Sequence, residues 1–159
     1  MRLGEPIAAI GGLLVLVALA LPWYQATGSG WSLDVERPPA VAGDLPSFSA
    51  FTAMTVIDFL IAFIALLAIL VPIASASTSG PTKSIAAAVL ASAFGWIAIL
   101  LVLFRIVDIP GEQLEVRYGA WLALAGTIIA WVGSWLSLRD ESTPGAVTPD
   151  VPVRPAPSP

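Results

Sequence analysis

The sequence predicts an all-α membrane protein: an antiparallel four-helix transmembrane bundle with a small extracellular cap. Of its 159 residues, 57% are hydrophobic and 11% are charged, whereas soluble domains average about 45 to 50% apolar and about 25% charged residues. The mean hydropathy is +0.89. The chain also contains four mostly apolar runs close to the roughly 20 residues that a helix needs to cross a bilayer.

The predicted transmembrane domain covers residues 1–138. Charged residues, prolines and glycines bound its four helices, which we place at residues 6–23, 54–74, 84–104 and 119–138. The short inner loop 75–83 makes the second and third helices an antiparallel hairpin. The outer loops are then residues 24–53 and 105–118, and in the second of these Asp108, Pro110 and Gly111 favour a turn.

The first run has a second interpretation, as a signal peptide. Arg2 precedes a short apolar core, and the Ala-Leu-Ala of residues 18–20 resembles a cleavage site. Two features count against this interpretation: Glu5 makes the N-terminal segment less basic, and Pro22 lies close to the cleavage site. We therefore favour an uncleaved first helix.

Lysine and arginine set the orientation, because they are enriched on the cytoplasmic side of membrane proteins. Arg2, Lys83, Arg139 and Arg154 lie on one side, against Arg37, Arg105 and Arg117 on the other. Arg2 precedes the first helix, and no lysine or arginine follows that helix until Arg37. We expect a multi-pass protein of the cell membrane with both termini in the cytoplasm. Four aromatic residues then form an outer belt, namely Trp23, Tyr24, Tyr118 and Trp121.

The last segment, residues 139–159, has a different composition and is predicted to be a disordered cytoplasmic tail. It carries charged residues followed by prolines at positions 144, 149, 152, 155, 157 and 159. Its P-x-x-P spacings could dock into an aromatic groove of a protein partner. The alternative is a solubilising tail without a partner.

Small residues at three- and four-residue spacing mark the faces on which membrane helices pack. The fourth helix carries the longest such run, and the third contributes a glycine; the residues of this predicted seam are Gly95, Gly119, Ala123, Gly126, Ala130 and Gly133. Similar stripes on the other two helices predict a compact bundle with little room for a pore.

Asp58 is the one ionisable residue well inside a predicted span, and a carboxylate at membrane depth costs roughly 2.5 to 3.5 kcal/mol on insertion scales. Arg105 follows the row of small residues on the third predicted helix, at the outer end of that helix. Asp58 lies near the outer end of the second predicted helix, so the two residues are expected at the same height. We therefore predict an Asp58–Arg105 ion pair. It acts either as a structural clamp, which we favour, or as a proton or cation relay.

The outer loops contain two segments with alternating polarity, residues 31–36 and 113–118, which could pair as two short strands of the cap. Trp31 in the first segment is a candidate partner contact; the alternative is that it packs on the top of the bundle. Acidic residues outnumber basic ones in these loops, which we interpret as a solvated surface.

Several classes of function are excluded by composition. The chain has no cysteine and no histidine, which removes disulfides, thiol nucleophiles, metal sites built on those residues and imidazole chemistry. The net charge of -4 provides no basic surface for nucleic acid. We expect no enzymatic activity, cofactor or metal.

Four segments carry a resemblance to known proteins: residues 21–24 (Leu-Pro-Trp-Tyr), the stretch from Ser49 to Asp58, residues 103–111 and residues 117–122. In these the chain resembles the small, functionally uncharacterised four-helix integral membrane proteins that are widespread in actinobacteria. The resemblance covers roughly residues 6–140 and implies location and topology alone. The layout is also similar to claudin-like tetraspans, but only in architecture, because the claudin loop motif and its cysteines are missing.

The sequence thus favours a non-enzymatic scaffold or accessory subunit of the cell envelope. Its partners would be the lipid bilayer and a protein bound through the outer cap or the Pro-rich tail. The alternative is a small proton-linked transporter, or a subunit of one, that uses Asp58 and Arg105.

Overall fold

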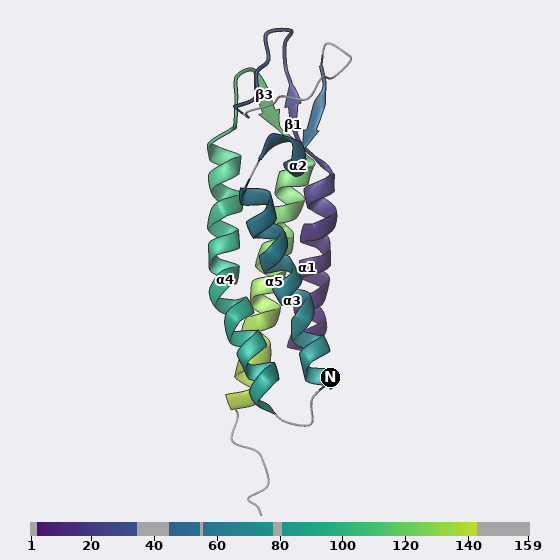
Figure 1. Ribbon diagram of the computed structural model, residues 1–159, viewed down its shortest axis with the longest axis vertical. Helices are drawn as coiled ribbons and strands as arrows, with labels where there is room; N and C mark the ends of the chain where they lie inside the picture. Colours follow the sequence, from purple (N-terminus) through teal and green to yellow (C-terminus); the bar gives the residue numbers. More distant parts are fainter. Residues whose placement is uncertain (1–2, 35–44, 55, 78–80, 143–159) are drawn as a thin grey trace, which may run out of the picture.

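The computed structural model describes residues 3–34, 45–54, 56–77 and 81–142, and shows a long helix bundle beneath a small sheet (Figure 1). The elements in chain order are α1 Gly4–Ala20, β1 Pro22–Ala26, β2 Ser47–Ser49, α2 Ala50–Ala53, α3 Ile57–Ser77, α4 Pro81–Val107, β3 Leu114–Val116 and α5 Tyr118–Ser142. The prediction of a mostly helical chain is confirmed. The sheet has three strands among the described residues, where two were expected, and α2 was not expected.

The ends of the helices differ from the predicted ones for physical reasons. Helix α1 starts at Gly4, because Pro6 is tolerated in a first turn, where its missing N–H has no partner to lose. It ends at Ala20, because the residue before a proline avoids helical geometry, so Pro22 and Trp23 lie in β1. Helix α5 continues past residue 138 to Ser142. The rest of the predicted tail, residues 143–159, lies outside the described residues.

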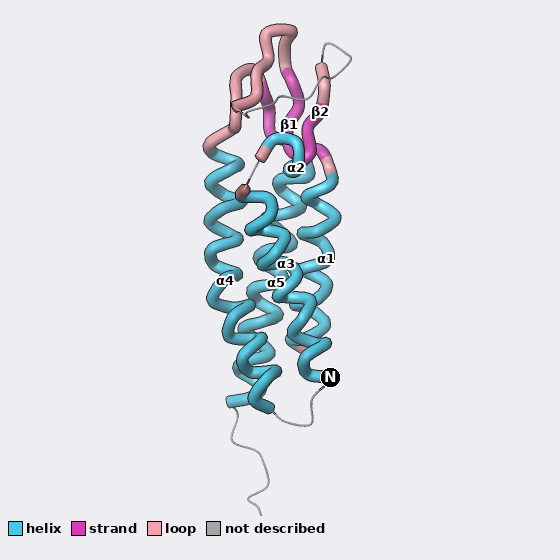
Figure 2. Tube along the Cα trace, in the orientation of Figure 1, coloured by secondary structure: helices cyan, strands magenta, loops and turns pink. Residues whose placement is uncertain are grey.

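The four long helices surround a common axis, and each packs against antiparallel neighbours. Helix α1 contacts α5 and α3, and α4 contacts the same two helices from the other side. The cyclic order is therefore α1, α3, α4, α5, as Figure 2 shows. The most extensive contact joins α1 to α5, which are the first and last helices of the chain.

The cap is an antiparallel sheet in the order β2-β1-β3. Strand β1 lies in the middle, with Tyr24 opposite Val116 of β3 and Pro22 opposite Ser49 of β2. The expected pairing of residues 31–36 with 113–118 is wrong, because β1 takes the place beside β3. The backbone of Ser32 instead hydrogen-bonds that of Glu112 in both directions. Residues 35 and 36 lie outside the described part.

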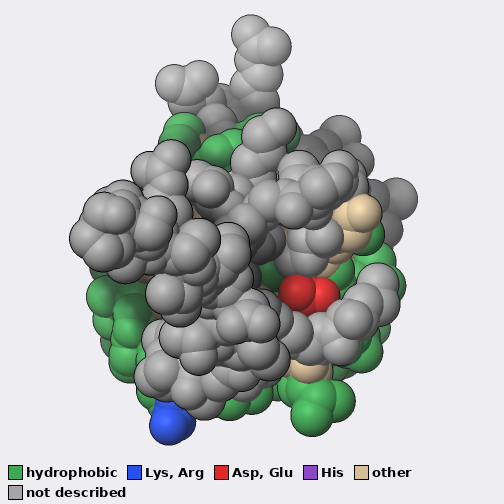
Figure 3. Space-filling view, turned by 90° about the horizontal axis from the view of Figure 1, so that it is seen from below, with side chains coloured by type: hydrophobic (Ala, Val, Ile, Leu, Met, Phe, Trp, Pro, Cys, Tyr) green, Lys and Arg blue, Asp and Glu red, His purple; other side chains and the backbone are tan. Residues whose placement is uncertain are grey.

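The outside of the bundle is strongly apolar. Within the described residues, two helical segments are long and apolar enough to cross a membrane, Ala88–Val107 of α4 and Tyr118–Arg139 of α5, whereas α1 and the Ile57–Ile73 part of α3 are shorter apolar helices. Less than half of each longer segment is buried inside the protein, unlike the core helix of a soluble protein. Seen from below, hydrophobic side chains reach the rim of the bundle (Figure 3).

Candidate functional site

The candidate site lies at the end of the bundle where the cap meets the helices. Asp58 occupies the first turn of α3 and is 1% exposed. The backbone N–H groups of Asp58 and Phe59 face its carboxylate, and a carboxylate in the first turn also interacts favourably with the helix dipole. Its Oδ1 atom is buried without a hydrogen-bond partner. The first turn of α3 therefore offsets part of the free-energy cost of burying this carboxylate.

Arg105 does not pair with Asp58, so the predicted ion pair is wrong. Arg105 lies in the last turn of α4, and its Nη1 atom is 3.9 Å from Oδ2 of Asp108, three residues further along the chain. The Nε atom of Arg105 is buried without a partner. The spacing of small residues placed both residues at the same end of the bundle, but it could not show that the arginine side chain reaches forward to Asp108 on its own segment.

Two buried aromatic side chains of β1 join the cap to the helices. The indole Nε1 of Trp23 donates a 2.7 Å hydrogen bond to the carbonyl oxygen of Ala18, at the end of α1. The hydroxyl of Tyr24 donates a 2.7 Å bond to the carbonyl oxygen of Arg105, at the end of α4. Neither side chain is exposed, so their expected place in an outer aromatic belt is wrong. Tyr118 and Trp121 of that belt are exposed.

Burial raises the pKa of the Tyr24 hydroxyl to about 12, with smaller opposing effects of Arg105 and Asp108. Because the pKa is higher in the folded protein, the unfolded chain loses this proton at a lower pH, from about pH 10. The stabilising contribution of Tyr24 is therefore complete below pH 10 and is lost as the pH rises through 12.

We expect the stability advantage of the parent over Tyr24→Phe to shrink by about 1.4 kcal/mol between pH 8 and pH 11. The measurement is the free energy of unfolding of both proteins in mixed micelles titrated with sodium dodecyl sulfate. Tyr24→Phe serves as the control, because it lacks the titrating hydroxyl and keeps every other titratable group of the parent. An advantage that stays constant up to pH 11 would contradict the burial of this hydroxyl.

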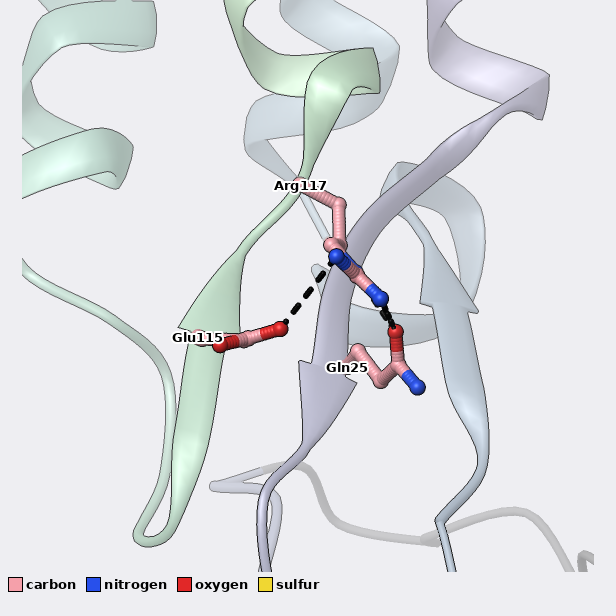
Figure 4. Close-up of polar contacts among 3 residues, drawn as sticks. All are labelled: Gln25, Glu115 and Arg117. Atoms are coloured by element: carbon pink, nitrogen blue, oxygen red, sulfur yellow. Dashed lines mark hydrogen bonds and ion pairs between the residues drawn. The ribbon is translucent and has the colours of Figure 1, made fainter.

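The exposed side of the cap is held together by polar contacts between β1 and β3. Arg117, which follows β3, donates hydrogen bonds to Oε1 of Gln25 on β1 (Figure 4). Its Nη1 atom also lies 3.4 Å from Oε1 of Glu115 on β3. Trp31 packs against Phe48 of β2, with 5.0 Å between the ring centroids. Trp31 is therefore half-buried in the cap, which favours the packing alternative over a free partner contact.

The predicted seam lies at the interface of α1 and α5. A Cβ atom added to Gly133 would overlap the backbone of Ala8, and one added to Gly11 would overlap the backbone of Ala130. The backbones of the two helices therefore touch along their length. The seam residues Gly119, Ala123, Gly126, Ala130 and Gly133 are all buried. Gly95 lies elsewhere, on α4, where it makes room for the indole ring of Trp131.

A small cavity lies at mid-height between the four helices. It offers about 10 Å³ to the centre of a water molecule, which is room for about one water. Its lining is almost entirely apolar, including Ile61, Ala65 and Ala98, and its polar groups are Thr127 and the indole of Trp131. No ionisable side chain lines it. This part of the interior therefore gives no polar route inward from Asp58.

The described residues contain no group of three or more histidine, cysteine, aspartate or glutamate side chains that could hold a metal ion. The geometry thus provides two buried carboxylates, Asp58 at the cap end of α3 and Glu5 in the first turn of α1, and a cap anchored by hydrogen bonds. No protein-family model, curated protein or solved structure matches the chain.

Proposed function

We propose that the chain is a multi-pass protein of the cell membrane, with α1, α3, α4 and α5 all crossing the bilayer, both termini in the cytoplasm and the cap outside. The apolar segment of α5 has 22 residues, or about 33 Å at 1.5 Å per residue, against a hydrocarbon core of about 30 Å. Helix α1 touches α5 from Gly4, beside Ser137, up to Val15, beside Gly126. Pro22 of β1, just beyond the end of α1, lies beside Gly119. A bilayer that surrounds α5 therefore also surrounds α1.

The polar residues at the two ends of the bundle support the same placement. Tyr118 and Trp121 are exposed near the outer end of α5, and Trp135 is exposed near its inner end. The guanidinium of Arg139 lies 4.8 Å from the centre of the Trp135 ring. Tryptophan, tyrosine and arginine are typical of the two membrane–water interfaces. We therefore place the inner interface at Arg139.

Within this placement we infer a non-enzymatic scaffold or accessory subunit of the envelope. The observation that carries the proposal is the close packing of the described helices: backbones in contact between α1 and α5, and a mid-height pocket with room for about one water. Such a molecule binds partners through its surface, chiefly through the cap. Trp23 and Tyr24 fix the cap to the ends of the helices. The resemblance to actinobacterial four-helix proteins agrees with this placement.

A proton-linked transporter is the second candidate, because the carboxylate of Asp58 is buried with an oxygen atom that has no partner. Intramembrane carboxylates often mark proton or ion paths. We prefer the scaffold because the described helices pack closely and the pocket between them has no ionisable lining residue.

Proton flux into liposomes separates the two candidates. We expect liposomes containing the purified protein and an internal pH dye to acidify at the same rate as empty liposomes under an imposed gradient. The variants are Asp58→Asn and, as a matched control, Asp108→Asn, whose carboxylate is exposed. A flux that Asp58→Asn abolishes and Asp108→Asn preserves would replace the scaffold with a transporter.

A further inference from the structure

The outer end of the molecule carries an apolar surface that is separate from the cap's polar side. Phe51 of α2, Val56 just before α3, and Phe59 in the first turn of α3 are 49, 71 and 67% exposed. The rings of Phe51 and Phe59 lie 6.4 Å apart. We call Phe51, Val56 and Phe59 the interfacial patch. In Figure 1, α2 lies across the top of the bundle, beneath the sheet.

We propose that the interfacial patch is inserted into the outer leaflet of the bilayer, so that α2 is a lipid-binding element of the cap. This inference rests on the proposed membrane-spanning placement of α3. It adds a specific lipid contact by Phe51 and Val56, which precede the spanning helix.

The first argument is the continuity of the patch with the outward face of α3. Phe59 begins a row of exposed large apolar side chains at alternating four- and three-residue spacing, which continues through Phe63, Leu66, Leu70 and Ile73. Such a row forms one face of a helix. The contact between Phe51 and Phe59 extends this face upward onto α2, and the surface that lipid covers on α3 has no break there.

The second argument is length. The apolar part of α3 has 17 residues, or about 26 Å, which is shorter than a hydrocarbon core of about 30 Å. A short helix must be accommodated by thinning of the bilayer or by flanking apolar groups. Phe51 and Val56 supply such groups directly above α3. They therefore complete the height of the apolar surface on this side of the bundle.

The third argument is charge. The chain from Leu45 to Ile57 has no charged residue, and in α2 the residues Ala50 and Ala53 face the core while Phe51 faces outward. The opposite outer segment, between α4 and α5, exposes Asp108, Glu112, Glu115 and Arg117. One side of the cap is thus suited to lipid and the other to water. A bilayer that covers the patch therefore removes no charge of residues 45–57 from solvent.

Spin labelling tests this inference, and the absence of cysteine from the chain allows single-site labels. The variants are Phe51→Cys and Val56→Cys, with Leu66→Cys as the lipid control and Glu115→Cys as the water control. Each is labelled and placed in nanodiscs of phosphatidylcholine and phosphatidylglycerol. The measurement is the collision rate of the label with oxygen, which concentrates in lipid, relative to that with a water-soluble nickel chelate.

We expect labels at 51 and 56 to collide more with oxygen than with the chelate, as at 66, and the label at 115 to show the reverse. If 51 and 56 resemble 115 while 66 stays in lipid, the patch lies in water and only this inference fails. If 51 and 56 are shielded from both reagents, a protein surface covers them, which also overturns it. If 66 itself lies in water, the spanning placement of α3 fails and the lipid patch fails with it.

Discussion

Replacing Gly133 with leucine is expected to separate α1 from α5 and to lower the free energy of unfolding by at least about 3 kcal/mol, the upper part of the range for overpacked cores. A Cβ atom at this position would overlap the backbone nitrogen of Ala8. Backbone atoms within a helix cannot rotate away as a side chain can. The whole helix must therefore move, and the other close contacts of this interface, such as that of Gly11 with Ala130, are lost with it.

Ala125→Leu is the matched control for this substitution. Ala125 lies on the same helix but is exposed, so the added atoms extend outward and meet no helix of the bundle. We expect this variant to unfold like the parent in mixed micelles titrated with sodium dodecyl sulfate. Equal stability of Gly133→Leu and Ala125→Leu would show that the two helix backbones do not touch in the folded protein.

The close α1–α5 contact has a clear basis in the sequence. In membranes, association of helices depends on close packing, and small residues allow it. Such residues recur at four- and three-residue spacing on both helices: Gly4, Ala8 and Gly11 on α1, and Gly126, Ala130 and Gly133 on α5. The pattern predicted which faces pack but not which helices pair, because similar stripes occur on all four helices. Pairing depends on how the connections close the bundle.

The features of the site that could not be predicted depend on side-chain direction. Spacing along a helix placed Asp58 and Arg105 at one end of the bundle, but the direction of a long arginine side chain is decided by its local contacts, here with Asp108. Trp23 and Tyr24 were assigned to a membrane interface because aromatic residues are enriched there. Pro22 was the available signal against this, since a helix usually ends before a proline.

Strand β2 was missed for a different reason. It has three residues, too few for an alternating pattern to be distinguished from a loop. Its partner β1 follows a helix directly and carries a register irregularity between Pro22 and Tyr24. Long-range pairing with β1 holds it in place, and a local pattern cannot report such pairing.

Trp23→Ala is expected to be the most destabilising truncation in the cap, at about 3 to 5 kcal/mol, the usual cost of deleting a buried tryptophan ring. Trp23 is fully buried, and Gly119 of α5 leaves the space in which the indole lies. The ring packs in the same apolar cluster as Leu19, Ala50 and Ala53. Its loss therefore leaves a void where α1, α5 and α2 meet beneath the sheet.

Two further variants separate the causes of this effect. Trp121→Ala removes the same side chain from a position that is 55% exposed, and we expect it to cost much less, because lipid fills the space that the ring leaves. Trp23→Phe keeps most of the packing but removes the hydrogen bond to Ala18, so it should cost about 1 to 2 kcal/mol. Unfolding in mixed micelles measures all three variants. If Trp23→Ala and Trp121→Ala were equally stable, the Trp23 ring would not anchor the cap to the bundle. Of the two buried aromatic side chains of β1, only Tyr24 would then hold the cap above the helices.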